Sequence, residues 1–245
     1  MNKFIIANWK MNKTIEDSLE FINYIKNKNF NPKYEIVICP AFTCLYSMKQ
    51  LTENLDIKLG AQNCHWEDSG AYTGEVSPEM LSDLKVSYVI VGHSERRKYF
   101  DETDEMINRK IKKATDNNMK VILCVGEDLS CHEQHREREF ILNQLKKCLV
   151  GLSRESLKDI LIAYEPLWAI GSGKVMNAEE AQKIAVSIKK FISDKYSNCK
   201  IPVIYGGSVS SENFKEFLDF DEIDGLLIGG DSLNAEHFAK IISEK

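Results

Sequence analysis

The sequence predicts an α/β fold of the (β/α)8 barrel type. Eight short apolar runs follow one another along the 245 residues, and segments with helical periodicity lie between them. Most runs are nearly continuous in hydrophobicity, which is typical of parallel strands covered on both faces. No linker or shift in composition divides the chain, so we expect one barrel domain over residues 1–245. A doubly wound open sheet is the alternative built from the same elements.

The elements alternate strand then helix from the N-terminus onward. The predicted strands are Phe4–Ala7, Glu35–Ile38, Ile57–Gly60, Tyr88–Val91, Val121–Val125, Ile160–Tyr164, Pro202–Tyr205 and Gly225–Ile228. Helical periodicity is evident in Ser18–Ile25, Glu105–Ile111 and Ala181–Ile188. The segment Cys64–Val76 has neither period, and a loop of this length is usually functional or docked against another surface.

Composition excludes several classes of partner. The formal charge is −5 and the pI is about 5.7, with basic residues scattered among acids, so we expect no nucleic-acid partner. No apolar run is long enough to cross a membrane, and the first run is too short for a secretory signal, which predicts a cytoplasmic protein without a membrane partner. Seven cysteines without a C-x-x-C pair favour free thiols over a disulfide framework.

Neither a metal nor a nucleotide cofactor is expected. Cys131, His132 and His135 are close in sequence but lack a fourth ligand of the right kind nearby. The stretch Gly171–Lys174 resembles part of a Walker A loop, yet Trp168 stands where the first glycine belongs and Val175 replaces the Ser or Thr. These two segments therefore do not predict a zinc site or a nucleotide site.

Polar residues and glycines recur where the predicted strands end. They are Asn8 and Lys10 after the first strand, His93 after the fourth, Glu165 after the sixth, Gly206-Gly207-Ser208 after the seventh and Gly229-Gly230 after the eighth. In both candidate architectures ligands gather at the carboxyl ends of the strands. The sequence thus predicts a functional site at this rim, with the glycine turns offering backbone N–H groups to a phosphate.

Glu165 is a candidate general base. Pro166 restricts Glu165 to an extended conformation, which aims the side chain at the strand end. A carboxylate in a partly apolar site beside Trp168 would have the raised pKa that suits a base. An ordinary solvated glutamate is the alternative.

His93 is a candidate electrophile. Ser94 and Glu95 look like an N-cap followed by an acidic first helical turn. The positive end of a helix dipole disfavours protonation and would keep His93 a neutral hydrogen-bond donor. A buried, satisfied histidine is the alternative. Lys10 would supply a fixed positive charge beside an anionic substrate, although an exposed lysine needs no such explanation.

Several longer motifs together resemble the triosephosphate isomerase family. They are Ala7–Asn12, Gly92–Arg97, Ala163–Gly171 and Tyr205–Val209, supported by Gly60–Asn63, Gly70–Glu75 and Cys124–Glu127. The resemblance spans from the first strand to Gly229-Gly230. It implies a TIM barrel that interconverts dihydroxyacetone phosphate and D-glyceraldehyde 3-phosphate in glycolysis and gluconeogenesis, by proton transfer through an enediolate and without cofactor or metal.

The resemblance also implies roles for single residues. Glu165 would move the proton, His93 would polarise the carbonyl, Asn8 and Lys10 would bind and stabilise the enediolate, Glu95 would support Lys10, and Gly171, Ser208, Gly229 and Gly230 would bind the phosphate. A lid would run from Pro166–Trp168 to Lys174–Met176. The chain would form a homodimer in which the loop Cys64–Val76, with its tip near Thr73-Gly74, inserts into the other subunit.

Some positions depart from the family pattern. Val175-Met176 replaces a smaller, more polar pair, and the stretch Ser130–His135 differs from the usual acidic run. Asp231 stands where alanine is common. A second anion 4 Å from a phosphate costs about 1 kcal/mol even in water, so we expect the Asp231 side chain to point away.

Two other functions fit the same fold. A different phosphate-binding barrel, such as an isomerase or aldolase for another sugar phosphate, would keep the glycine turns but need not keep Asn8, Lys10, His93 and Glu165 together. A non-catalytic barrel used for binding or adhesion could lose the base or the electrophile, and this sequence retains both.

Overall fold

Eight parallel strands form a closed barrel in the computed structural model, which describes residues 2–169 and 176–244. The strands are β1 (Lys3–Asn8), β2 (Tyr34–Cys39), β3 (Ile57–Ala61), β4 (Tyr88–Val91), β5 (Lys120–Val125), β6 (Ile160–Tyr164), β7 (Val203–Tyr205) and β8 (Gly225–Ile228). All eight predicted strands are confirmed. The seventh begins after Pro202, which lacks the N–H that a strand interior needs.

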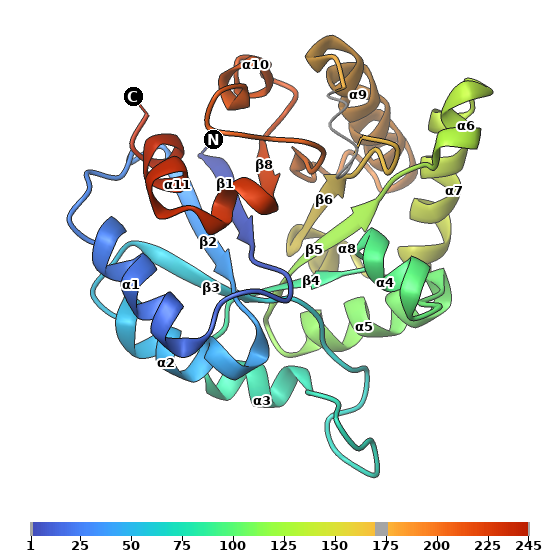
Figure 1. Ribbon diagram of the computed structural model, residues 1–245. Coiled ribbons are helices and arrows are strands. Elements are labelled where there is room, and N and C mark those ends of the chain that lie inside the picture. Colours follow the sequence, from blue (N-terminus) through green and yellow to red (C-terminus); the bar gives the residue numbers. More distant parts are fainter. Residues whose placement is uncertain (1, 170–175, 245) are drawn as a thin grey trace.

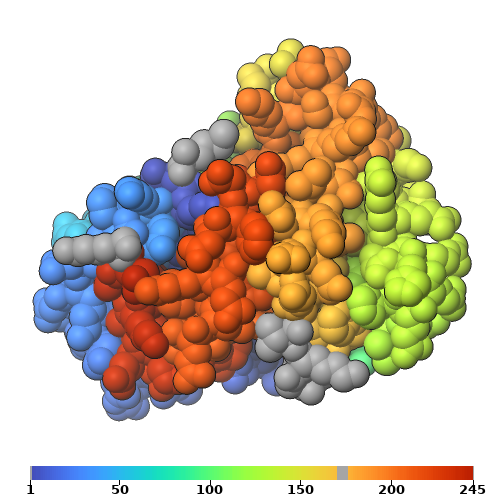
Figure 2. Space-filling view, turned by 90° about the horizontal axis from the view of Figure 1, so that it is seen from above, coloured from blue at the N-terminus to red at the C-terminus, as the bar shows by residue number. Residues whose placement is uncertain are grey.

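Pairing between the first and last strands closes the ring. Phe4 of β1 lies in register with Gly225 of β8, and Ala7 with Ile228, while the other edge of β1 pairs with β2. In the space-filling view the blue N-terminal and red C-terminal segments accordingly lie side by side (Figure 2). A closed ring excludes the doubly wound open sheet.

Helices surround the barrel (Figure 1). They are α1 (Ile15–Ile25), α2 (Phe42–Thr52), α3 (Pro78–Asp83), α4 (Ser94–Tyr99), α5 (Asp104–Asp116), α6 (Leu129–Glu133), α7 (Glu137–Cys148), α8 (Arg154–Lys158), α9 (Ala178–Lys195), α10 (Phe214–Leu218) and α11 (Ala235–Ile242), with a 3₁₀ turn, η1 (Gly230–Leu233), before α11. The three predicted helices are confirmed within α1, α5 and α9. Each begins before the predicted range, at a residue that follows a capping side chain such as Thr14 on α1, which satisfies one of the first N–H groups. Helices α5 and α9 also continue past their predicted C-terminal ends.

Two apolar layers explain why the strands are hydrophobic throughout. Ile6 belongs to a cluster made of strand residues alone, which fills the barrel interior. Its neighbours Ile5 and Ala7 belong to a larger cluster that includes helix residues and lies between barrel and helices. Successive side chains of a strand point to opposite faces, so most strand positions are buried, with Lys58 of β3 an exposed exception. The ends of the strands are then the places where polar groups can gather.

The segment Cys64–Val76 contains no helix or strand, as predicted. In Figure 1 this segment, in teal before α3, projects from the body of the barrel, and residues 68–75 are all exposed. Across the described ranges, no helix combines the length and apolar character needed to cross a bilayer.

Candidate active site

A cavity of about 470 Å³ opens at the carboxyl ends of the strands. Its lining residues are Asn8, Lys10, His93, Glu165, Gly206, Gly207, Ser208, Val209, Ser210, Asn213, Leu227, Gly229 and Gly230. The rim predicted from the sequence is therefore a real cavity, and the structure brings most of the predicted site residues into it. Gly171 and Val175 lie outside the described residues.

Glu165 lies directly after β6 and is almost completely buried in the cavity wall. Its Oε1 is 3.1 Å from Nε2 of His93, and its Oε2 accepts the N–H of Ser94 at 3.2 Å. Gly126, after β5, permits this placement, because a Cβ there would lie 1.7 Å from the carbonyl oxygen of Glu165. The alternative of a solvated glutamate is thus excluded.

His93 is itself the N-cap of α4, which corrects the assignment of that position to Ser94. Its Nδ1 accepts the N–H of Glu95 at 3.2 Å, so an imidazole takes the place of the usual hydroxyl or carboxylate oxygen. An Nδ1 that receives an amide hydrogen fits the neutral ring that carries its own hydrogen on Nε2. That hydrogen is directed at Oε1 of Glu165.

The pKa values of this pair differ from the sequence prediction. Burial raises the pKa of Glu165, but the attraction of His93, its hydrogen bond and the N–H of Ser94 outweigh burial, and the pKa is lowered. Burial lowers the pKa of His93, while Glu165 and then Glu95 raise it, and the net shift is upward. The predicted directions are wrong for this arrangement because each group is the other's direct partner, which neither local sequence reveals.

The indole of Trp168, predicted beside Glu165, donates its N–H to Oε1 of Glu127 at 2.8 Å. Tyr164 donates its hydroxyl to the same oxygen at 3.1 Å. Burial raises the pKa of Glu127 although these hydrogen bonds, Trp168 first, act to lower it. The raised carboxyl pKa expected near this strand end is therefore found at Glu127, not at Glu165.

Lys10 adopts a left-handed backbone conformation with a φ of 54°. Oδ1 of Asn8 accepts the Lys10 N–H at 3.1 Å, and the Gln62 amide donates to the Lys10 carbonyl at 2.8 Å. The ammonium group of Lys10 lies 2.7 Å from Oε1 of Glu95, as the resemblance implied. Such a conformation costs about 1–3 kcal/mol in a non-glycine residue and persists where its surroundings fix it, often at a functional site.

The turns after β7 and β8 form the side of the cavity away from β4. Gly229 precedes η1 and Gly230 is its first residue, and the first backbone N–H groups of such a turn have no partner within it. The hydroxyl of Ser208 donates to the carbonyl of Ala169 at 2.6 Å. Backbone N–H groups of this kind can hold an anion.

Sequence reasoning missed residues that shape these turns. Asn213 accepts the N–H of Ser210 at 2.8 Å and donates to the carbonyl of Ser208 at 3.2 Å. The spacing Ser-x-x-Asn after a strand is a local turn signal that could have revealed this. Gln62 also donates to the carbonyl of Cys39, and no local pattern predicts that contact.

The Asp231 side chain points away from the cavity, which confirms the prediction. Its Oδ2 accepts the N–H of Ser211 at 2.6 Å, and its Oδ1 is 2.8 Å from Nδ1 of His237.

No cluster of three or more potential metal ligands converges within residues 2–169 and 176–244. Of the histidines near Cys131, His132 stacks on Trp168 with ring centroids 4.2 Å apart and pairs with Glu137. The seven cysteines are free thiols.

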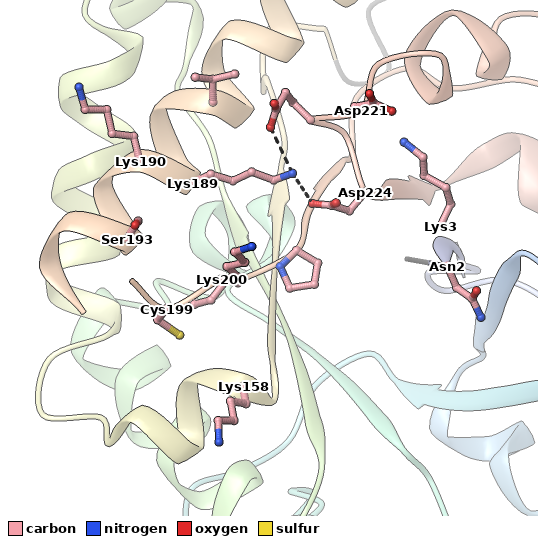
Figure 3. A pocket seen from close by; sticks show the side chains of 14 residues that line it. Asn2, Lys3, Lys158, Lys189, Lys190, Ser193, Cys199, Lys200, Asp221 and Asp224 are labelled. Atoms are coloured by element: carbon pink, nitrogen blue, oxygen red, sulfur yellow. Dashed lines mark ion pairs between the residues drawn. The ribbon is translucent and has the colours of Figure 1, made fainter. Parts of the chain in front are cut away.

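A larger cavity, of about 810 Å³, lies at the opposite end of the barrel (Figure 3). Lys3 donates there to the carbonyls of Phe220 and Ile223, and Lys189 lies between Asp224 at 2.8 Å and Glu222 at 3.5 Å. Carboxylates of the protein thus pair with Lys189, and backbone carbonyls accept the hydrogens of Lys3. The smaller cavity, with its contacting acid and base, is the better candidate for chemistry.

The closed barrel and this site define the class of the protein: a (β/α)8 barrel with a contacting Glu–His pair and glycine-containing turns around a cavity at the carboxyl ends of its strands.

Comparison with known proteins then identifies the family. The family model described as triosephosphate isomerase matches residues 3–245. The triosephosphate isomerase of Dictyoglomus turgidum is 50% identical over 245 residues, covering 98% of both chains. That of Alkaliphilus metalliredigens is 47% identical over 247 residues, covering 99% of this chain and 100% of the relative. That of Clostridium botulinum (strain Langeland) is 44% identical over 242 residues, covering 98% of each. The chain belongs to the triosephosphate isomerase family.

Proposed function

We propose that this chain interconverts dihydroxyacetone phosphate and D-glyceraldehyde 3-phosphate in glycolysis and gluconeogenesis. Family membership supports the reaction. The observation that carries the assignment of residues is the contact of 3.1 Å between Glu165 and His93 in the cavity wall. Removal of a proton from the carbon beside a carbonyl group needs a base and an oxyanion stabiliser that act in the same step. Glu165 can serve as the base and His93 as the stabiliser.

In this mechanism the substrate separates Glu165 from His93. The carboxylate of Glu165 takes the proton from the carbon that bears the hydroxyl group, leaving an enediolate. The hydroxyl proton then moves to the other oxygen of the enediolate, and Glu165 returns its proton to the neighbouring carbon. The Nε2–H of His93 donates to the carbonyl oxygen on which negative charge develops. Asn8 and Lys10 bind the same part of the substrate, and the ammonium of Lys10 offsets the negative charge.

Separation also makes Glu165 a stronger base. Contact with His93 opposes the effect of burial on the Glu165 pKa. Once the substrate replaces His93, that opposition is lost while burial remains, so the Glu165 pKa rises toward the value that suits a general base. The pairing therefore keeps the base ionised until the substrate enters.

The phosphate occupies the other side of the cavity. Ser208, Gly229 and Gly230 hold it through the turns after β7 and β8, and the resemblance adds Gly171. The resemblance also implies a lid, from Pro166–Trp168 to Lys174–Met176, most of which lies outside the described residues. Exclusion of water matters because an enediol phosphate can expel its phosphate. No metal or cofactor takes part in this scheme.

The same proposal includes a homodimer in which the loop Cys64–Val76 inserts into the other subunit. Residues 68–75 are all exposed and project from the barrel (Figure 1). Met11, next to Lys10, is 96% exposed, which is unusual for an apolar side chain at the edge of a site and fits coverage by a second subunit. Light scattering should give the mass of a dimer at micromolar concentration. A fully active monomer would contradict it.

We place the enzyme in the cytoplasm, without membrane or nucleic-acid partners. The seven free thiols suit a reducing compartment, and the charge of −5 does not favour a polyanion.

A coupled assay of glyceraldehyde 3-phosphate isomerisation tests the reaction. The matched variants are Glu165→Gln and, as a control, Glu155→Gln, which alters an exposed glutamate of α8. Fast turnover in the wild type and the control, lost in Glu165→Gln, is expected. Absent turnover in folded wild-type protein would overturn the proposal and indicate another phosphorylated substrate.

A further inference from the structure

Asp231 connects the two turns that line the phosphate side of the cavity. It belongs to η1, after β8, and its Oδ2 accepts the N–H of Ser211, in the turn after β7, at 2.6 Å. Its Oδ1 lies 2.8 Å from Nδ1 of His237, in the first turn of α11. The Asp231 carboxylate thus contacts both the turn after β7 and helix α11, while the Asp231 backbone forms part of η1.

We propose that Asp231 is a positioning residue for phosphate binding, and that His237 fixes the orientation of its carboxylate. The proposal rests on the proposed function, because it assumes that Ser208, Gly229 and Gly230 hold the substrate phosphate. Asp231 itself does not line the cavity, so it acts through the turns and does not touch the substrate.

The contact with Ser211 is well suited to fix the distance between the two turns. Ser211 is only 6% exposed, so its N–H would lose a partner in a place that water hardly reaches. A hydrogen bond to an ionised carboxylate is also shorter and stronger than one between neutral groups. The bonds that Asn213 makes to Ser208 and Ser210 stay inside the turn after β7. They shape this turn but do not attach it to η1.

Two effects of Asp231 on a bound phosphate oppose each other. Its negative charge repels the phosphate, whereas its hydrogen bond holds the binding turns in place. Asp231→Asn removes the charge and keeps an oxygen that can accept the Ser211 N–H. Asp231→Ala removes both. Comparison of these variants therefore separates positioning from charge.

The experiment measures KM and kcat for glyceraldehyde 3-phosphate and the inhibition constant of inorganic phosphate. Asp231→Ala should raise KM and the phosphate inhibition constant about three- to tenfold while kcat stays within a factor of about two, because the lost interaction serves ground state and transition state alike. Asp231→Asn should bind phosphate as well as the wild type or more tightly. His237→Leu should also raise KM and the phosphate inhibition constant, but by less than Asp231→Ala does.

Other outcomes would overturn the inference. If Asp231→Ala and Asp231→Asn tighten phosphate binding equally, Asp231 acts through its charge alone. Unchanged constants in Asp231→Ala would exclude any role for it, and unchanged constants in His237→Leu would exclude the orienting role of His237. Asp221→Ala makes the same change of charge at the opposite end of the barrel and should alter neither constant. A wild-type protein that neither isomerises the substrate nor binds phosphate would instead refute the proposed function.

Discussion

Glu165 and Glu102 are two buried glutamates that each accept a backbone N–H from the segment Gly92–Ser94, and they differ in their charged partners. Glu165 is 2% exposed and accepts the N–H of Ser94, whereas Glu102 is 5% exposed and accepts the N–H of Gly92. Both have a lowered pKa. Burial and the direction of the pKa shift therefore do not tell a reactive carboxylate from a structural one.

The charged partners make the difference. Glu102 lies between the ammonium of Lys110 and Nε of Arg96, the latter at 3.0 Å, and Lys110 is itself buried and donates to Asn63 at 2.8 Å. Burial raises the Glu102 pKa, but the opposite effects of Lys110 and then Arg96 are together larger, so the net shift is downward. Glu165 instead has a histidine as its partner and a cavity in front of it. In the proposed mechanism a substrate takes the place of the histidine, whereas Lys110 is buried beside Glu102.

The largest expected effect is on catalysis. Glu165→Gln should lower kcat by about 10²–10⁴, the range typical for loss of a general base, while inorganic phosphate still binds. The free energy of unfolding should fall by about 1–3 kcal/mol, because glutamine keeps only one of the two oxygens that accept from His93 and Ser94 and places an NH2 group against the other donor. Steady-state kinetics and urea unfolding at fixed protein concentration measure both. An equal loss of phosphate binding would indicate a structural role for Glu165.

Glu102→Ala should lower the stability of the protein much more than its catalytic rate. Removal of the carboxylate leaves Lys110 buried and without its charge partner, which typically costs about 3–5 kcal/mol. Urea unfolding should show this loss, and kcat per folded molecule should fall far less than in Glu165→Gln. Stability within about 1 kcal/mol of the wild type would show that the cluster around Glu102 is not the structural counterpart of the site.

The pH dependence of stability should sharpen the contrast. The Glu102 pKa lies below its usual value of 4.5, so the stability it contributes is complete above about pH 4.5 and is lost as the pH falls through the folded-state pKa. Glu102→Gln lacks this titration. The gap in unfolding free energy between wild type and Glu102→Gln should therefore narrow on acidification below pH 4.5, with a slope of at most about 1.4 kcal/mol per pH unit. A gap that stays constant from pH 7 to 3 would contradict the assignment.

Substitution of Glu127 should give the smallest effect on stability. The stability that depends on this group should change with pH in the opposite direction to that of Glu102. Its pKa is raised, and its Oε2 has no hydrogen-bond partner within the described part of the chain. A raised carboxyl pKa means that stability present below the usual value of 4.5 is lost as the pH rises through the folded-state pKa. The Glu127→Gln variant lacks this titration and does not lose stability in this way. The unfolding free energy of the variant minus that of the wild type should therefore increase from pH 4 to pH 7. A fall over that range would show that the Glu127 carboxylate is stabilised in the folded protein.

The strands and the place of the site could be predicted because the signals are local. Continuous apolar runs such as Val121–Val125 mark strands buried on both faces, and helical periodicity between them marks the covering helices. Once parallel strands alternate with helices, the end of each strand that carries the polar residues follows from chain direction alone. Asn8, His93, Glu165 and the glycine turns were found in this way.

The sequence by itself thus determined the alternating strands and helices, the strand ends at which polar groups gather and the types of group found there. Closure of the sheet into a barrel, which its motifs implied only by resemblance, is seen in the structure. Only the tertiary structure decided which groups meet: His93 with Glu165, Lys10 with Glu95, Asp231 with Ser211 and His237. Contacts between separate strands depend on the register and closure of the whole barrel, which no short window of sequence encodes. The pKa values depend on those contacts, so the local environment predicted a raised pKa for Glu165 whereas its distant partner lowers it.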